Sequence, residues 1–167
     1  MRILLRKASG EQHELTIVRP DGRRESLLCE TRSVLTHDFI HYAVESAAGI
    51  ETGFWGRLAH GRTLAEMNHR EGLPSADEAA EMATVERFVG AMSGAAKEVP
   101  AAELIAGIRR YAAAMDGEVP AWLTEAVVVD AQERLRGLVG AWRATSVGAA
   151  VELEWPPNAP PHVTSVR

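Results

Sequence analysis

The sequence predicts one α+β domain, with a sheet built from both ends of the chain and covered by four or five helices. Two patterns predict this class. Apolar and polar residues alternate with period two near both ends, which is typical of half-buried strands. Between those ends, apolar residues recur at spacings of three and four, which is typical of amphipathic helices. We therefore expect a three-stranded N-terminal antiparallel meander and a C-terminal strand in one sheet.

The length of 167 residues fits one domain with a substantial core. We expect residues 1–155 to form that domain. Residues 156–167 contain four prolines, which lack the backbone N–H that a strand needs. This composition predicts an extended or disordered proline-rich C-terminal tail.

Three short segments between residues 2 and 32 alternate in polarity, and their apolar positions are Ile3 and Leu5, Leu15 and Ile17, and Leu27 and Cys29. Residues 9–12 and 19–23 separate them. The second separator contains Pro20, which fixes φ, and Gly22, which accepts a positive φ in a tight turn. The segments are therefore expected to pair as consecutive antiparallel strands.

The first helix is expected over residues 33–49. Ser33 or Thr36 can accept a backbone N–H at its start, and Gly49 can end it in the left-handed conformation. Residues 50–62 are rich in glycine but include Phe54 and Trp55. We expect an ordered loop with one helical turn there, with both aromatic rings mostly buried.

The later helices are predicted from their starts and stops. A short helix over 63–69 is followed by a stop at 72–74. Ser75 and Glu78 have capping-box spacing, so a long helix is expected from there toward Lys97, with Glu86 on a solvated face. Proline in a first turn predicts two more helices, over 100–115 and from Pro120.

The last helix contains Gly137 and Gly140, which predict fraying or a bend because glycine costs about 1 kcal/mol in a helix relative to alanine. Period-two alternation then returns over residues 148–155, with Val151, Leu153 and Trp155 on one side. This segment is the expected fourth strand.

Composition narrows the classes of function. A net charge of −5 and a pI near 5.7 disfavour a nucleic-acid-binding protein, which usually has a basic face. Cys29 is the only cysteine, so an intramolecular disulfide is excluded and a reducing compartment is favoured. The sequence contains no recognisable signal-peptide core and no apolar run of membrane-spanning length. We expect a soluble cytoplasmic protein whose partner is another protein or a small molecule.

The most distinctive pattern lies in the first helix. His37, His41 and Glu45 recur every fourth residue, so they lie along one side of the helix with about 40° of drift per step. Imidazole and carboxylate groups are ligands of zinc and similar divalent metals. The three residues are therefore the predicted metal ligands. Because they span two turns, a compact site is more plausibly formed by two of them, completed by His60, His69 or a carboxylate from a later helix.

Residues 37–41 read His-Asp-Phe-Ile-His and resemble the H-E-x-x-H helix motif of the zincin metalloproteases, with aspartate in place of glutamate. The resemblance covers these five residues. It implies that His37 and His41 bind zinc and that Asp38 acts as the general base. Aspartate is one methylene shorter, which would draw the base away from a metal-bound water.

Two other interpretations remain open. In the first, the histidines are structural, each donating to a carbonyl or carboxylate, and the chain is a non-catalytic interaction or structural module without metal. In the second, Arg57, His60 and Arg62 form a small-anion or nucleotide site beside the glycines of the 50–62 segment.

Overall fold

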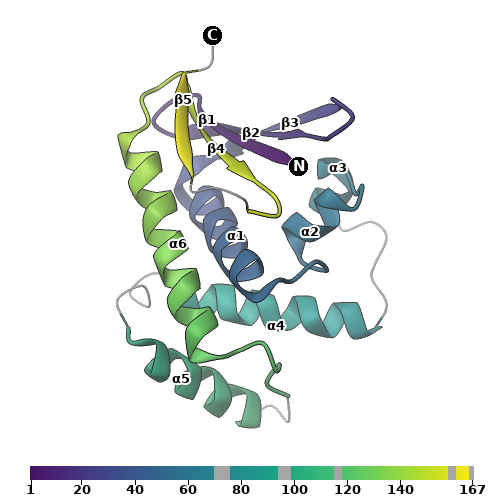
Figure 1. Ribbon diagram of the computed structural model, residues 1–167, viewed down its shortest axis with the longest axis vertical. Coiled ribbons are helices and arrows are strands. Elements are labelled where there is room, and N and C mark those ends of the chain that lie inside the picture. The colour runs from purple at the N-terminus through teal and green to yellow at the C-terminus, as the bar shows by residue number, and fades with distance from the viewer. Residues whose placement is uncertain (70–75, 94–98, 115–117, 158–160, 166–167) are drawn as a thin grey trace.

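The computed structural model describes residues 1–69, 76–93, 99–114, 118–157 and 161–165. Its sheet has the strand order β3-β2-β1-β4-β5, and every neighbouring pair is antiparallel. The strands are β1 Arg2–Lys7, β2 Gln12–Val18, β3 Arg24–Glu30, β4 Ala149–Glu154 and β5 His162–Ser165 (Figure 1). The α+β class, the N-terminal meander and its union with a C-terminal strand are thus confirmed.

The central strand β1 shows why the alternation in the sequence predicts the sheet. Leu5 is paired with Leu15 of β2 on one side and with Val151 of β4 on the other. All three are buried. The alternate positions, such as Arg6 opposite Glu14, are only partly buried, so apolar side chains lie on the face that the helices cover.

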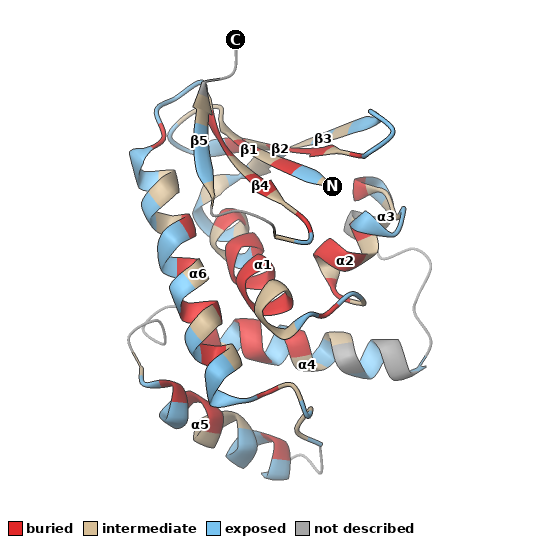
Figure 2. Cartoon of the chain, in the orientation of Figure 1, coloured by how far each residue is buried: buried red, intermediate tan, exposed pale blue. Residues whose placement is uncertain are grey.

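The described helices lie together beside this sheet (Figure 1). A π-helical turn η1 over Thr31–Leu35 leads into α1, and the helices are α1 Thr36–Ala48, α2 Phe54–Ala59, α3 Leu64–His69, α4 Ala76–Met92, α5 Ala101–Ala114 and α6 Glu125–Ala144. Helix α1 contacts both α6 and α4. Every residue from 38 to 45 is buried, so α1 forms the centre of the molecule (Figure 2).

The sheet has one strand more than the sequence predicts. Strand β5 comes from the segment expected to be an extended or disordered tail, and it pairs with β4 through Val151 and Val163. It covers backbone groups that would otherwise lie at an open sheet edge. Its four residues, His-Val-Thr-Ser, include one apolar side chain, so they show no period-two alternation.

The starts of two predicted helices need correction. Glu30, rather than Ser33 or Thr36, caps the first helical segment by accepting from the backbone N–H groups of Arg32 and Ser33. Helix α6 begins at Glu125, not at Pro120, because Thr124 is its N-cap and accepts from the N–H of Val127.

Helix α6 continues through Gly137 and Gly140 to Ala144, so the fraying expected there is not found. The predicted stop at 72–74, the capping serine at 75 and the end near Lys97 lie outside the described residues. In the described part of the chain, none of the helices is long and apolar enough to cross a membrane.

A buried arginine attaches α2 and α3 to the strands. Arg19 is 7% exposed, pairs with Glu25, and donates to the carbonyl oxygens of Leu58 and Arg62. Glu25 also accepts from the backbone N–H of Leu64 at the start of α3. The hairpin of β2 and β3 therefore fixes the position of the two short helices that flank the site described below.

Candidate metal centre

Helix α1 brings His37 and His41 side by side. Their spacing of four residues places them one turn apart, and their ring centroids are 4.4 Å apart. The His41 side chain is 6% exposed and that of His37 is 50% exposed. The pair therefore lies where the buried face of α1 meets the surface, as the sequence predicts.

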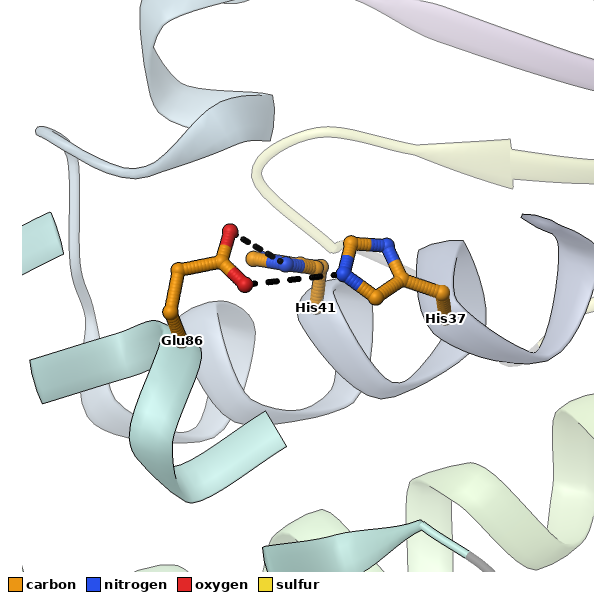
Figure 3. A group of neighbouring side chains, drawn as sticks. All are labelled: His37, His41 and Glu86. Carbon is orange, nitrogen blue, oxygen red and sulfur yellow. Dashed lines mark ion pairs between the residues drawn. The ribbon is translucent and has the colours of Figure 1, made fainter. Parts of the chain in front are cut away.

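Glu86 of α4 reaches both histidines from across the gap between the helices (Figure 3). Its Oε1 lies 3.2 Å from Nε2 of His41, and its Oε2 lies 3.5 Å from Nε2 of His37. Ligand atoms of the three residues all lie within 4.8 Å of one another. Two atoms that each lie about 2.1 Å from a tetrahedral ion are roughly 3.4 Å apart, so this group could hold a metal ion.

The opposite nitrogen of each imidazole faces a carboxylate on α1 itself. Nδ1 of His41 lies 3.0 Å from Oε1 of Glu45, and Nδ1 of His37 lies 3.7 Å from Oδ1 of Asp38. Metal-binding histidines commonly have such a carboxylate behind them, because it orients the ring and raises its basicity. Both histidines of this group have this arrangement.

Glu45 is completely buried and is shared between two helices. Besides contacting His41, it accepts from the backbone N–H groups of Phe54 and Trp55, at 2.8 Å and 2.9 Å. These are orphan donors at the start of α2, so Glu45 caps that helix. Gly53 makes room for it, since a Cβ there would lie 2.3 Å from the Glu45 Cδ. Glu45 is not among the residues whose ligand atoms gather in the described group.

The contact with Glu45 determines the tautomer of neutral His41. Because a carboxylate only accepts, Nδ1 of His41 carries the proton that it donates to Glu45. The lone pair then lies on Nε2, toward Glu86. This Nε2 is buried and makes no hydrogen bond of acceptable geometry with any described residue. A buried polar atom without a hydrogen bond is costly, and a metal ion would satisfy it.

Without a metal, the cluster is an ion-pair network. The Asp38 carboxylate, and after it Glu86, raises the pKa of His37 to about 9. Burial alone would lower the pKa of His41, but its contacts with Glu45 and Glu86 outweigh burial and raise it. The two histidines, His37 first, hold the pKa of Glu86 well below its usual range. An incoming metal must therefore displace protons from the imidazoles.

The cluster opens into a cavity of about 770 Å³ between α1, α4, α2, α3 and the strands. His37, His41 and Glu86 form part of its wall. Much of the remaining wall is apolar and comprises Leu15, Leu27, Val34, Phe54, Leu64 and Met67. Arg57 and Arg62 also line it. A metal bound by the cluster would face a largely apolar space that is partly open to solvent.

The three residues of the predicted anion site, Arg57, His60 and Arg62, each contact a different group of the protein. Arg57 donates to the carbonyl oxygen of Thr52, and Arg62 lies 3.8 Å from a Glu66 oxygen. His60 is 64% exposed and bonds through Nδ1 to the carbonyl oxygen of Gly56. The two arginines reach the cavity, whereas His60 is not part of its wall. The side chain of His69, also considered as a ligand, lies outside the described part of the structure.

Glu86 is the residue of the group that the sequence pattern did not single out. It is exposed, as expected, but it also pairs with both histidines. The sequence contains a hint of this position, because Glu86 follows the apolar Met82 by four residues and precedes Val89 by three. It therefore lies beside the apolar stripe of α4. The sequence analysis expected that a carboxylate from a later helix could complete the site, but it did not identify Glu86 as that residue.

Comparison with protein family models, curated proteins and solved structures found no match, so the chemistry of the site itself must carry any statement about function.

Proposed function

We propose that this chain is a divalent-metal protein whose ion binds between α1 and α4. The ligands would be Nε2 of His37, Nε2 of His41 and a carboxylate oxygen of Glu86. One observation carries the proposal: the buried Nε2 of His41 makes no hydrogen bond of acceptable geometry and lies 3.2 Å from Oε1 of Glu86, while Nδ1 is held by Glu45. Ligand atoms of His41 and of the other two candidate residues lie within 4.8 Å of one another.

The donor set favours zinc. Two histidines and one glutamate are a common ligand set of catalytic zinc sites, which leave a further position for water or substrate. The same donors in a facial arrangement also bind iron(II). In this chain an open position would face the cavity. When bound there, zinc would act as a Lewis acid or lower the pKa of a bound water.

The two carboxylates on α1 would orient the ligands instead of binding the ion. Glu45 supports this role because its oxygens already accept from His41 and from two backbone N–H groups. For Asp38, the supporting observation is its position 3.7 Å from Nδ1 of His37, behind the ring. We propose this role for Asp38 in preference to the general-base role that the zincin resemblance implies.

A structural role without metal is the second candidate. The observation that favours it is that Glu86 pairs with both histidines and thereby connects α4 to α1 without any ion. In that case the chain would be an interaction or structural module, and the cluster would contribute stability alone.

Metal analysis of protein purified without a histidine tag separates the two candidates. After removal of metal by a chelator and reconstitution, the wild type should bind one equivalent of zinc. His41→Gln and Glu86→Gln should abolish stoichiometric binding, while His60→Gln, which alters an exposed histidine outside the cluster, should leave it unchanged. Wild-type protein with no zinc above background would contradict the metal proposal and favour the structural role.

A further inference from the structure

We propose that the cavity at the metal centre takes a small molecule with an apolar body and a single oxygen-bearing head group that binds the metal. A medium-chain carboxylic acid or hydroxamic acid represents this class. The inference rests on the proposed metal site and adds the chemical class of the molecule that would occupy its open position.

The dimensions of the cavity support a small-molecule ligand. Its volume of about 770 Å³ lies within the range of roughly 300–1,000 Å³ that is typical of such sites. Its walls come from strands β2 and β3 and from helices α1 to α4. Met67 and Met82 are among the lining residues, and methionine side chains adapt readily to the shape of an apolar ligand.

Most polar side chains of the described wall outside the cluster have partners within the protein, although the buried Nη2 of Arg57 makes no hydrogen bond with a described residue. Glu45 accepts from the start of α2, Arg57 donates to Thr52, and Arg62 lies near Glu66. Among the described lining residues, the His37, His41 and Glu86 group is the one that brings several potential metal-ligand atoms together. A ligand that fits has one polar end directed to this group and an apolar remainder along the wall.

The formal charge of the loaded cavity disfavours polyanions such as nucleotides. Its described lining contains four carboxylates and two guanidinium groups, namely Asp38, Glu45, Glu66, Glu86, Arg57 and Arg62. With neutral histidines, a divalent ion makes these charges balance. A site without net positive charge gives phosphate groups no general electrostatic attraction, whereas a single weakly acidic head can bind the metal directly.

The test compares two hydroxamates on zinc-loaded protein whose metal stoichiometry has been measured first. Acetohydroxamate and octanohydroxamate have the same head and differ by six methylene groups. Each buried methylene should improve affinity about threefold to fourfold. With all six methylenes buried, we therefore expect calorimetry to show octanohydroxamate binding on the order of a thousandfold tighter. Metal-free protein should bind it at least tenfold more weakly than loaded protein.

A matched pair of variants locates the alkyl chain. Leu27 lines the cavity, whereas its neighbour Leu28 is 57% exposed and is not part of the lining. Leu27→Trp should remove most of the advantage of octanohydroxamate while leaving zinc stoichiometry and acetohydroxamate binding unchanged. Leu28→Trp should change none of the three. The chain-length comparison on wild-type protein decides the inference even where Leu27→Trp lowers the melting temperature.

The two proposals fail in different ways. One equivalent of bound zinc with equal affinities for the two hydroxamates would overturn the apolar-ligand inference and leave the metal site intact. Equal binding of octanohydroxamate to loaded and metal-free protein would also overturn it, because the head would not be bound by the metal. Absence of stoichiometric zinc would overturn the proposed function itself.

Discussion

The carboxylate of Glu45 lies 3.0 Å from Nδ1 of His41, and both residues are buried in the centre of the molecule. The same carboxylate accepts from the first two backbone N–H groups of α2. One residue therefore connects the position of a short helix with the orientation of a candidate metal ligand. The variants Glu45→Gln and Gly53→Ala test this connection directly.

Glu45→Gln should reduce both stability and metal affinity. The amide keeps the size of the side chain but turns an NH₂ group toward donors that need an acceptor. A buried donor left unsatisfied costs about 1–3 kcal/mol, which urea unfolding would measure. Loss of an orienting carboxylate should weaken zinc binding about 10–100-fold. Glu51→Gln is the control, since that side chain is 77% exposed. Unchanged zinc affinity in Glu45→Gln would contradict the orienting role.

Zinc binding should strengthen with pH well beyond the range of an ordinary histidine. The pKa of His37 is raised to about 9, first by Asp38 and then by Glu86, so this ring releases its proton only as pH approaches 9. Competition with a chromophoric chelator, corrected for the chelator's own protonation, should therefore show affinity rising from pH 6 to about 9. Asp38→Asn should move the plateau to lower pH. An affinity that levels off at pH 7 in the wild type would refute this assignment.

Gly53→Ala should disturb the site from outside the cluster. The added methyl group would lie 2.3 Å from Cδ of Glu45, so Glu45 or the start of α2 must move. Overpacking of this kind costs about 1–3 kcal/mol, and zinc affinity should fall with it. Gly90→Ala in α4 is a control of opposite sign, because nothing lies within 4 Å of its Cβ position and alanine favours a helix. Equal melting temperatures for the two variants would count against the close packing at Gly53.

Trp55→Ala should lower the free energy of unfolding by about 3–5 kcal/mol. The ring is fully buried, its Nε1 donates to the carbonyl oxygen of Asp38 at 3.3 Å, and it contacts Tyr42 edge to face. Trp55→Phe should cost less because it keeps an aromatic ring in the core. Urea unfolding measures both variants, and a stable Trp55→Ala protein would show that α2 does not need this anchor.

The fold could be predicted where the sequence pattern is long. Period-two segments predicted β1 to β3 and β4, because each alternation reflects one buried face of the sheet. Strand β5 could not be predicted, since its four residues depend on the edge that β4 offers. The start of α6 was misplaced because proline in a first turn and threonine at an N-cap are both common helix starts, and here Thr124 is the residue used.

The candidate site could be predicted only in part. The spacing of His37 and His41 follows from the geometry of one helix, so it can be recognised in the sequence. Glu86 could not be identified, because its contact depends on how α4 crosses α1. For Glu45, the spacing gives the correct side of the helix, but it does not reveal that the start of α2 meets its carboxylate. Contacts between elements require the folded chain.

X-ray absorption at the zinc edge of reconstituted wild-type protein tests the central claim most directly. The proposal predicts one zinc ion per chain with two imidazole nitrogens at about 2.0–2.1 Å and carboxylate oxygen in the same shell. His41→Gln, if it retains any zinc, should show at most one imidazole. A zinc shell of oxygen atoms alone in the wild type would contradict a metal shared by His37 and His41.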